Sequence, residues 1–265
     1  MSNVMLAFLL SLAAGLSTGI GGLITLFTKK KNTDFLAISL GFSAGVMVYV
    51  SLAALLPEAK GQLSVMLGDK IGEIAAVLSF FAGMLLAALI DKILPDERNP
   101  HEIKHFEAMR SPNEPNTKLM RTGVITAIAI SVHNFPEGIA TFISALHDPA
   151  VALPIVLAIA LHNIPEGVSV SVPIYYATGN KRKALLYSFA SGLAEPFGAL
   201  LCYLILMPFL NEIVFGVLFA IIAGIMVFIS FDELLPAARE YGEHHHSIYG
   251  MVGGMAVMAV SLILL

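Results

Sequence analysis

One hexapeptide occurs twice in this chain, each time in the middle of a long apolar segment. The copies are HNFPEG at residues 133–138 and HNIPEG at residues 162–167, 29 residues apart. A carboxylate, an imidazole and a carboxamide are costly in hydrocarbon, and proline weakens a helix interior. Two copies of the same costly cluster indicate one two-sided site, and their side chains are of the kinds that bind divalent metals. We therefore expect a metal site inside a membrane transporter.

The spacing within the motif places its polar side chains on one helical face. Each helical residue turns by about 100°, so Asn134 lies near 100° from His133, and Glu137 lies near 40°, between them. The same relation holds in the second copy. If the two helices face each other, two ligand sets share the carboxylates: His133, Glu137, His162 and Glu166 in one, and Asn134, Asn163 and the same glutamates in the other. The expected centre is binuclear.

The prolines of the motif predict irregular helices at the site. Pro136 and Pro165 each remove a backbone donor, which frees the carbonyl groups of Val132 and Leu161 and bends the helix there. A broken helix inside a membrane is tolerated where it lines a cavity.

Glu195, which is followed by Pro196, is a third acidic residue in the middle of an apolar segment. Three uncompensated carboxylates at this depth would cost roughly 8–10 kcal/mol. Since no lysine or arginine lies deep in an expected span, protonation or a bound cation must offset the charge. A protonated structural glutamate and a proton relay are the alternatives, although a relay does not account for the paired asparagines.

The ligand types narrow the choice of ion. Imidazole, carboxylate and amide oxygen without sulfur suit Zn²⁺, Fe²⁺, Mn²⁺, Co²⁺ and Cd²⁺, whereas an all-oxygen site would favour Mg²⁺ or Ca²⁺. Cys202 is the only cysteine, so neither a disulfide nor a thiolate site is expected. The sequence therefore predicts broad specificity among transition metals.

Further polar residues are candidates for the metal pathway. Asp232 and Glu233 end an apolar segment and are predicted to form an exit path, with a solvated helix end as the alternative. Glu58 is a weaker candidate for an outer counterpart. Histidines in the polar loops could capture metal or be ordinary solvated residues: His101, His105 and His244 to His246.

Composition indicates an all-α polytopic membrane protein. The chain of 265 residues is 57% hydrophobic and 13% charged, where soluble domains carry about a quarter charged residues. A spanning helix needs about 20 apolar residues. Eight spans are expected, near 4–27, 35–56, 74–94, 122–145, 150–173, 184–206, 213–235 and 247–265. They form a single transmembrane domain over 1–265, with a cytoplasmic loop at about 95–121 between spans 3 and 4.

The distribution of basic residues orients these spans. With the N-terminus outside, 13 of the 15 lysines and arginines fall in inner loops, and only Lys60 and Lys70 lie outside. This is a strong positive-inside bias, so both termini are expected outside the cytoplasm. A basic face of the kind that binds nucleic acid is absent from the pattern.

Two internal matches predict an inverted repeat. Residues 44–59 match 223–238 at nine of sixteen positions, and residues 11–22 match 188–199 more weakly, at five of twelve. Span 2 therefore resembles span 7, and span 1 resembles span 6, in opposite membrane orientations. We expect spans 1–3 and 6–8 to be related around central spans 4 and 5, an arrangement common in secondary transporters. The GxxxG spacings at Gly15/Gly19 and Gly41/Gly45 predict close helix packing.

The paired His-Asn-x-Pro-Glu-Gly motifs in consecutive central spans, with Glu-Pro in the next span, resemble the ZIP (Zrt/Irt-like) metal transporters, and most closely their bacterial members. The resemblance covers the whole eight-span layout. It implies a transport site made of His133, Asn134, Glu137, His162, Asn163, Glu166 and Glu195. Some relatives have an aspartate where Asn163 stands, so the charge of the second metal position differs here.

The resemblance further implies zinc uptake into the cytoplasm across a bacterial inner membrane. It also implies a homodimer embedded in lipid, and spans 1, 4, 5 and 6 moving against spans 2, 3, 7 and 8. No enzymatic activity and no cofactor besides the transported metal are expected. Two alternatives stay open from the residues alone: an intramembrane zinc metallohydrolase, which the absence of HExxH disfavours, and a metal-selective channel.

Overall fold

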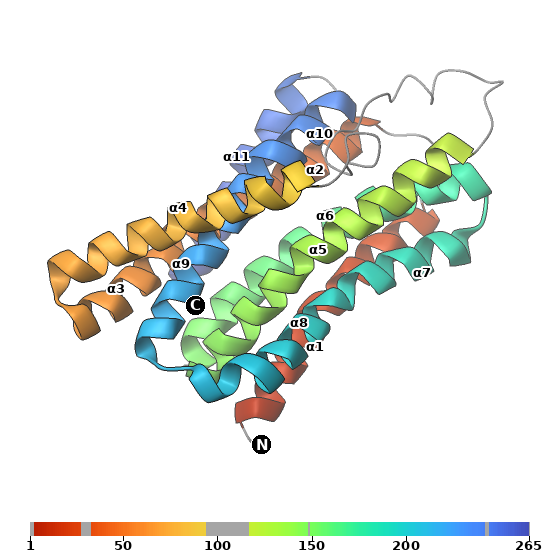
Figure 1. The fold of residues 1–265 in the computed structure, drawn as a ribbon. Helices are drawn as coiled ribbons and strands as arrows, with labels where there is room; N and C mark the ends of the chain where they lie inside the picture. Colours follow the sequence, from red (N-terminus) through yellow and green to blue (C-terminus); the bar gives the residue numbers. More distant parts are fainter. Residues whose placement is uncertain (1–2, 28–32, 94–116, 148, 242–243, 265) are drawn as a thin grey trace.

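The computed structural model describes residues 3–27, 33–93, 117–147, 149–241 and 244–264, and within them every regular element is helical (Figure 1). The α-helices are α1 (Asn3–Phe27), α2 (Thr33–Val50), α3 (Leu56–Leu67), α4 (Asp69–Ile93), α5 (Thr117–His147), α6 (Pro149–Thr178), α7 (Lys181–Gly192), α8 (Ala194–Leu201), α9 (Glu212–Ile229), α10 (Leu235–Tyr241) and α11 (His244–Leu264). Short segments of other helix types join some of them: the π-helical η1 (Ser51–Leu55), η3 (Cys202–Leu206) and η5 (Ser230–Leu234), and the 3₁₀ turn η4 (Met207–Phe209).

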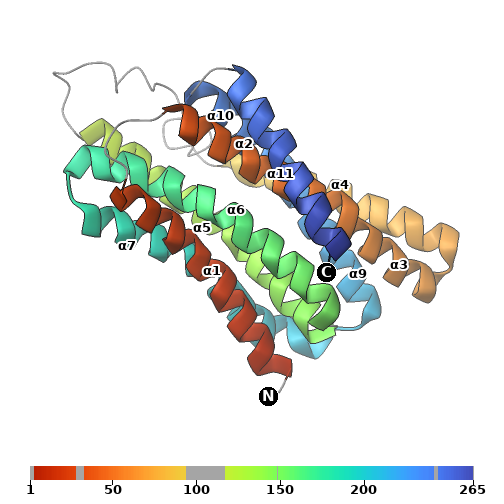
Figure 2. The ribbon, with the colours of Figure 1, turned by 180° about the vertical axis from the view of Figure 1, so that it is seen from behind.

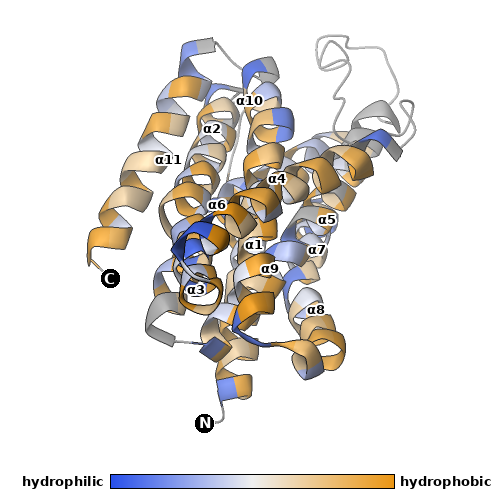
Figure 3. Ribbon diagram, turned by 60° about the vertical axis from the view of Figure 1, so that its left-hand side comes forward, coloured by the Kyte–Doolittle hydropathy of each residue, from blue (hydrophilic) through white to orange (hydrophobic). Residues whose placement is uncertain are grey.

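Seven helical segments among the described residues are long and apolar enough to cross a membrane. They correspond to all of the expected spans except the fourth, which α5 contains. Apolar residues predominate along the helices, and hydrophilic residues gather mainly near helix ends (Figure 3). The chain is therefore an integral membrane protein with several helical spans.

The helices form two groups that lie side by side (Figures 1 and 2). The first bundle contains α1, α5, α6, α7 and α8, and the second contains α2, α3, α4, α9, α10 and α11. The main contact between the two bundles runs along α2 and α6, with a smaller one between α5 and α9. This interface is where a site shared between the bundles can form.

Each π-helical segment precedes a leucine- or methionine-proline pair. The Leu56 N–H bonds the Ser51 carbonyl just before Pro57, and the Leu235 N–H bonds the Ser230 carbonyl just before Pro236. In the same way, the Met207 N–H bonds the Cys202 carbonyl just before Pro208. A wider turn gives the proline ring room beside the preceding carbonyl groups, so the chain continues as a helix.

The wider turn explains one difference from the expected spans. Span 2 was expected to end at residue 56, but after η1 the chain continues through Pro57 as α3 and reaches Leu67. The expected span 184–206 is likewise not one regular helix. It is interrupted at Leu193 because Pro196 supplies no N–H to the Gly192 carbonyl and glycine is itself a weak helix former.

The expected breaks at the motif prolines are absent. α5 runs through Pro136, and α6 runs through Pro154, Pro165 and Pro173, as continuous α-helices. A proline removes one hydrogen bond of the ladder, and packing on both sides of these central helices holds the remaining turns in place. The helices are therefore not interrupted at the motifs, while the bends expected at Pro136 and Pro165 stay predictions.

Glycines permit close backbone contacts between α1 and α7 and between α2 and α11. A Cβ on Gly15 would lie 2.3 Å from the Gly192 carbonyl oxygen, and a Cβ on Gly192 would lie 2.1 Å from the Gly15 carbonyl oxygen. Gly41 and Gly45 meet the carbonyl oxygens of residues 247 and 251 in α11 in the same way. The prediction that the GxxxG spacings serve helix packing is confirmed.

Enlarging Gly192 should separate α1 from α7. We expect Gly192→Ala to destabilise the protein by about 1–3 kcal/mol, because backbone rather than a flexible side chain occupies the space. The measurement is thermal loss of the helical circular-dichroism signal in detergent. Gly253→Ala in α11 is the control, since nothing lies within 4 Å of its Cβ position. Equal melting temperatures for the two variants would contradict the tight contact.

Candidate metal centre

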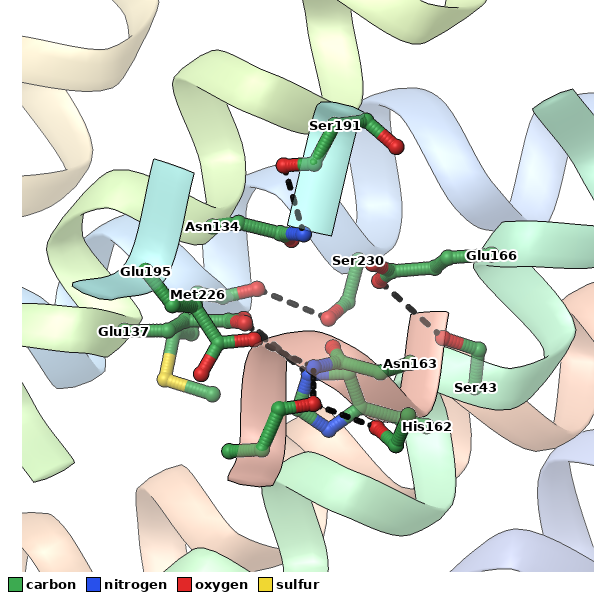
Figure 4. Close-up of polar contacts among 12 residues, drawn as sticks. Ser43, Asn134, Glu137, His162, Asn163, Glu166, Ser191, Glu195, Met226 and Ser230 are labelled. Carbon is green, nitrogen blue, oxygen red and sulfur yellow. Dashed lines mark hydrogen bonds and ion pairs between the residues drawn. The ribbon is translucent and has the colours of Figure 1, made fainter. Parts of the chain in front are cut away.

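The two motif copies lie on facing stretches of α5 and α6, and their polar side chains meet in the interior (Figure 4). Six of the seven predicted ligands are fully buried: Asn134, Glu137, His162, Asn163, Glu166 and Glu195. The seventh, His133, lies in α5, and its side chain is outside the described part of the structure. The described carboxylates and amides therefore lie where water does not solvate them, and they depend on one another.

His162 and Glu137 form the closest link between the two copies. The Nε2 atom of His162 lies 3.1 Å from both Oε1 and Oε2 of Glu137. Two tetrahedral zinc ligands with bonds of about 2.0–2.1 Å are roughly 3.3 Å apart. The imidazole and the carboxylate are thus already spaced like two ligands of one ion.

Asn134 and Glu166 form the second link between the copies. In the orientation of Figure 4, Asn134 Nδ2 donates to the Ser191 carbonyl at 3.4 Å. Turning the amide by 180° places its nitrogen 3.1 Å from Glu166 Oε2 and 3.2 Å from the Ile130 carbonyl. The turned orientation makes two shorter bonds, so it describes the amide better.

Asn163 connects the second motif copy to α8 and α1. Its Nδ2 donates to Glu195 Oε1 through a short hydrogen bond and to the Ala14 carbonyl at 3.0 Å. Asn163 Oδ1 and Glu195 Oε2 are buried and accept no hydrogen bond from the described residues. A buried acceptor without a donor costs about 1–3 kcal/mol, and a bound cation would remove that cost.

The second bundle contributes Ser43 to this centre. Ser43 Oγ, on α2, donates to Glu166 Oε1 at 3.4 Å, so a carboxylate of the first bundle touches the second bundle at the site (Figure 4). Sequence analysis missed Ser43 because it lies one residue before the repeated segment 44–59 and matches Ile222 in the other half. The backbone carbonyl groups of Ala14 and Ile130 had no sequence signal either.

The glycine that ends each motif copy sets the approach of a neighbouring helix. A Cβ on Gly138 would lie 2.0 Å from the Glu195 carbonyl oxygen, and a Cβ on Gly167 would lie 1.8 Å from the Thr18 carbonyl oxygen. Any side chain at either position would push α8 or α1 away. The motif therefore specifies the spacing of the helices as well as the ligands.

Among the side chains that the structure describes, no three histidine, cysteine, aspartate or glutamate residues converge on one metal position. The expected sets also use His133 and two asparagines, so both four-ligand sets stay predictions. The described geometry brings together one histidine–glutamate pair and one asparagine–glutamate pair, each from both motif copies.

The candidate pathway residues lie away from this centre. Asp232 and Glu233 lie in η5, the first exposed and the second partly buried, and their role as an exit path stays a prediction. His246 Nδ1 lies 3.2 Å from Asp34 Oδ1, which ties α11 to the start of α2. Three of the candidate histidines have side chains outside the described residues: His101, His105 and His244.

Comparison with known proteins places this chain in a family. Residues 92–262 match the family described as ZIP Zinc transporter. Proteins named zinc transporter ZupT are 58% identical in Oceanobacillus iheyensis (100% of both chains) and 60% identical in Streptococcus mutans (97% of both). A third, in Clostridium perfringens, is 56% identical over 100% of this chain and 97% of its own. The chain belongs to the ZIP zinc transporter family.

Proposed function

We propose that the chain carries Zn²⁺ and related divalent transition metals into the cytoplasm by alternating access through the centre between α5 and α6. The observation that carries the proposal is the fully buried contact between His162 and Glu137, one from each copy of the duplicated motif, at 3.1 Å. A buried imidazole and carboxylate at ligand spacing favour a divalent transition metal. The similarity to proteins named zinc transporters supports zinc as the main ion.

The two-bundle architecture supports alternating access. Most of the proposed ligands belong to the first bundle, while Ser43 reaches Glu166 from the second. A relative movement of the bundles would break and remake this contact, which exposes the same site to one side of the membrane at a time. We propose that the first bundle (spans 1, 4, 5 and 6) moves against the second (spans 2, 3, 7 and 8).

The eight-span layout and the inverted repeat belong to the same proposal, in which α5 is the fourth of the eight spans. The π-helical segments η1 and η5 fall at matching positions of the repeated segments 44–59 and 223–238. The glycine contacts also match: Gly21 meets the Ile164 carbonyl, while Gly198 meets the Phe135 carbonyl. In the alignment these positions correspond, so α1 packs on α6 as α8 packs on α5.

The orientation and oligomeric state are further parts of the proposal. The clustering of basic residues in alternate loops supports termini outside the cytoplasm, and the bacterial relatives support an inner-membrane location. α4 exposes apolar side chains such as Leu78 and Leu85, which can contact either lipid or a second copy, so the homodimer stays a prediction.

Removing the charge of Glu137 should abolish transport. We expect Glu137→Gln to lower the zinc uptake rate of reconstituted liposomes by at least about 100-fold, because a direct ligand to the ion is lost. At known metal sites, changing a residue that only supports a ligand already lowers metal affinity or activity about 10- to 100-fold. Glu73→Gln in α4 is the matched control, since that glutamate is exposed and remote from the centre. Uptake by the double variant Glu137→Ala, Glu166→Ala at the native rate would overturn the site.

The same liposomes separate the alternatives. Saturable flux without turnover of peptide or lipid supports a transporter, non-saturating flux supports a channel, and hydrolysis supports a metallohydrolase.

The number of bound ions can be tested at Glu195. Glu195→Gln keeps an oxygen that accepts from Asn163 Nδ2 but removes the charge. If the centre is binuclear, zinc bound per purified chain should fall by one equivalent, and the remaining ion should still depend on His162 and Glu137. An unchanged stoichiometry would show that Glu195 holds no ion.

A further inference from the structure

A polar cluster at the end of the molecule opposite the basic loops lies outside the centre described above. It joins three elements: Glu58 and Gln62 in α3, His147 at the end of α5, and Glu212 at the start of α9. His147 is ten residues beyond Glu137 on the same helix, which corresponds to ~15 Å. The cluster is therefore separate from the central ligands but lies on a helix that carries them.

Two atoms of this cluster lie slightly farther apart than two ligands of one metal ion. His147 Nδ1 lies 3.8 Å from Glu212 Oε2, and the two side chains are 27% and 49% exposed. Tetrahedral zinc ligands are roughly 3.3 Å apart, so a small rotation of either side chain admits an ion. Both side chains are partly open to solvent, in contrast to the buried centre.

The neighbouring amide fixes the ring proton. Gln62 Nε2 donates to Glu58 Oε1 at 3.1 Å and lies 2.9 Å from His147 Nε2. An amide nitrogen only donates, so His147 Nε2 accepts and the proton of the neutral ring is on Nδ1, facing Glu212. The ring also packs on Phe215 with centroids 4.4 Å apart, which limits its rotation.

We propose that His147 and Glu212 form an external acceptor site for a divalent transition-metal ion on its way to the central site; this rests on the proposed transport direction. The ion replaces the proton between Nδ1 and Glu212. The ring then carries its proton on Nε2, and the Gln62 amide turns so that its oxygen accepts it. The turned Gln62 amide gives up its hydrogen bond to Glu58, and its oxygen then orients the ring, as second-shell groups do at other metal sites.

Two protein ligands suit an acceptor better than a storage site. Water fills the remaining coordination positions, so the ion is held weakly and can leave. His147 belongs to the first bundle and Glu212 to the second, so an ion at this site also links the bundles at their outer end. The site would raise the local concentration of metal where the bundles separate.

The test is zinc uptake by liposomes containing the full chain. His147→Phe keeps the ring contact with Phe215 and removes both nitrogens, and we expect it to raise KM for zinc about tenfold with an unchanged maximal rate. Glu212→Gln should do the same. Asp69→Asn removes another negative charge near this end and should leave KM unchanged. An equal rise in KM for Asp69→Asn would show general surface attraction and overturn the site.

Equilibrium zinc binding to purified protein separates this proposal from the proposed function. In a Glu137→Ala, Glu166→Ala background we expect one weak zinc site, which His147→Phe removes. Residual binding that survives His147→Phe, or a fall in maximal rate with unchanged KM, would mean that His147 is only a structural contact between the bundles. Because binding is measured without flux, failure of transport does not affect this result.

Discussion

The arrangement of the central helices depends on the need to compensate carboxylates buried in a membrane. Glu137, Glu166 and Glu195 are fully buried, and each touches an imidazole, an amide or a hydroxyl from a different helix. At a cost of about 2.5–3.5 kcal/mol per mid-membrane charge, no single helix could carry these residues alone. The contacts around these carboxylates therefore link helices of the first bundle to one another and, through Ser43, to the second bundle.

Close helix packing is the second condition for this centre, because these side chains are short. The glycines that end the motifs let α8 and α1 approach α5 and α6 closely enough for Asn163 to reach both Glu195 and the Ala14 carbonyl. The motif thus combines ligands, a proline and a contact glycine in six residues. This combination explains why the motif is informative in sequence: it specifies chemistry and packing together.

The sequence was sufficient for the helical class, for most spans and for the set of buried polar residues, because apolar length and polar residues within it are local signals. It was insufficient where a contact depends on two distant elements. Ser43 is an ordinary serine until α2 meets α6, and His147 is an ordinary loop-end histidine until α3 and α9 surround it. The effect of the prolines was hard to predict for a related reason. Whether Pro136 interrupts α5 depends on the helices packed around it, and α5 is continuous there.

The proposed repeat has an unequal distribution of charge at the centre. Its alignment pairs Thr18 in α1 with Glu195 in α8, and the backbone carbonyl of each packs against a motif glycine. These two backbone contacts match under the proposed repeat, but of the paired residues only Glu195 in α8 is a carboxylate. The hydroxyl of Thr18 is buried without a hydrogen-bond partner in the described residues, and a neutral oxygen attracts a cation far less than a carboxylate does. If the proposed repeat and the proposed metal centre hold, an acid on the α8 side alone favours an ion displaced toward α8, and the two halves of the repeat need not be equivalent during transport.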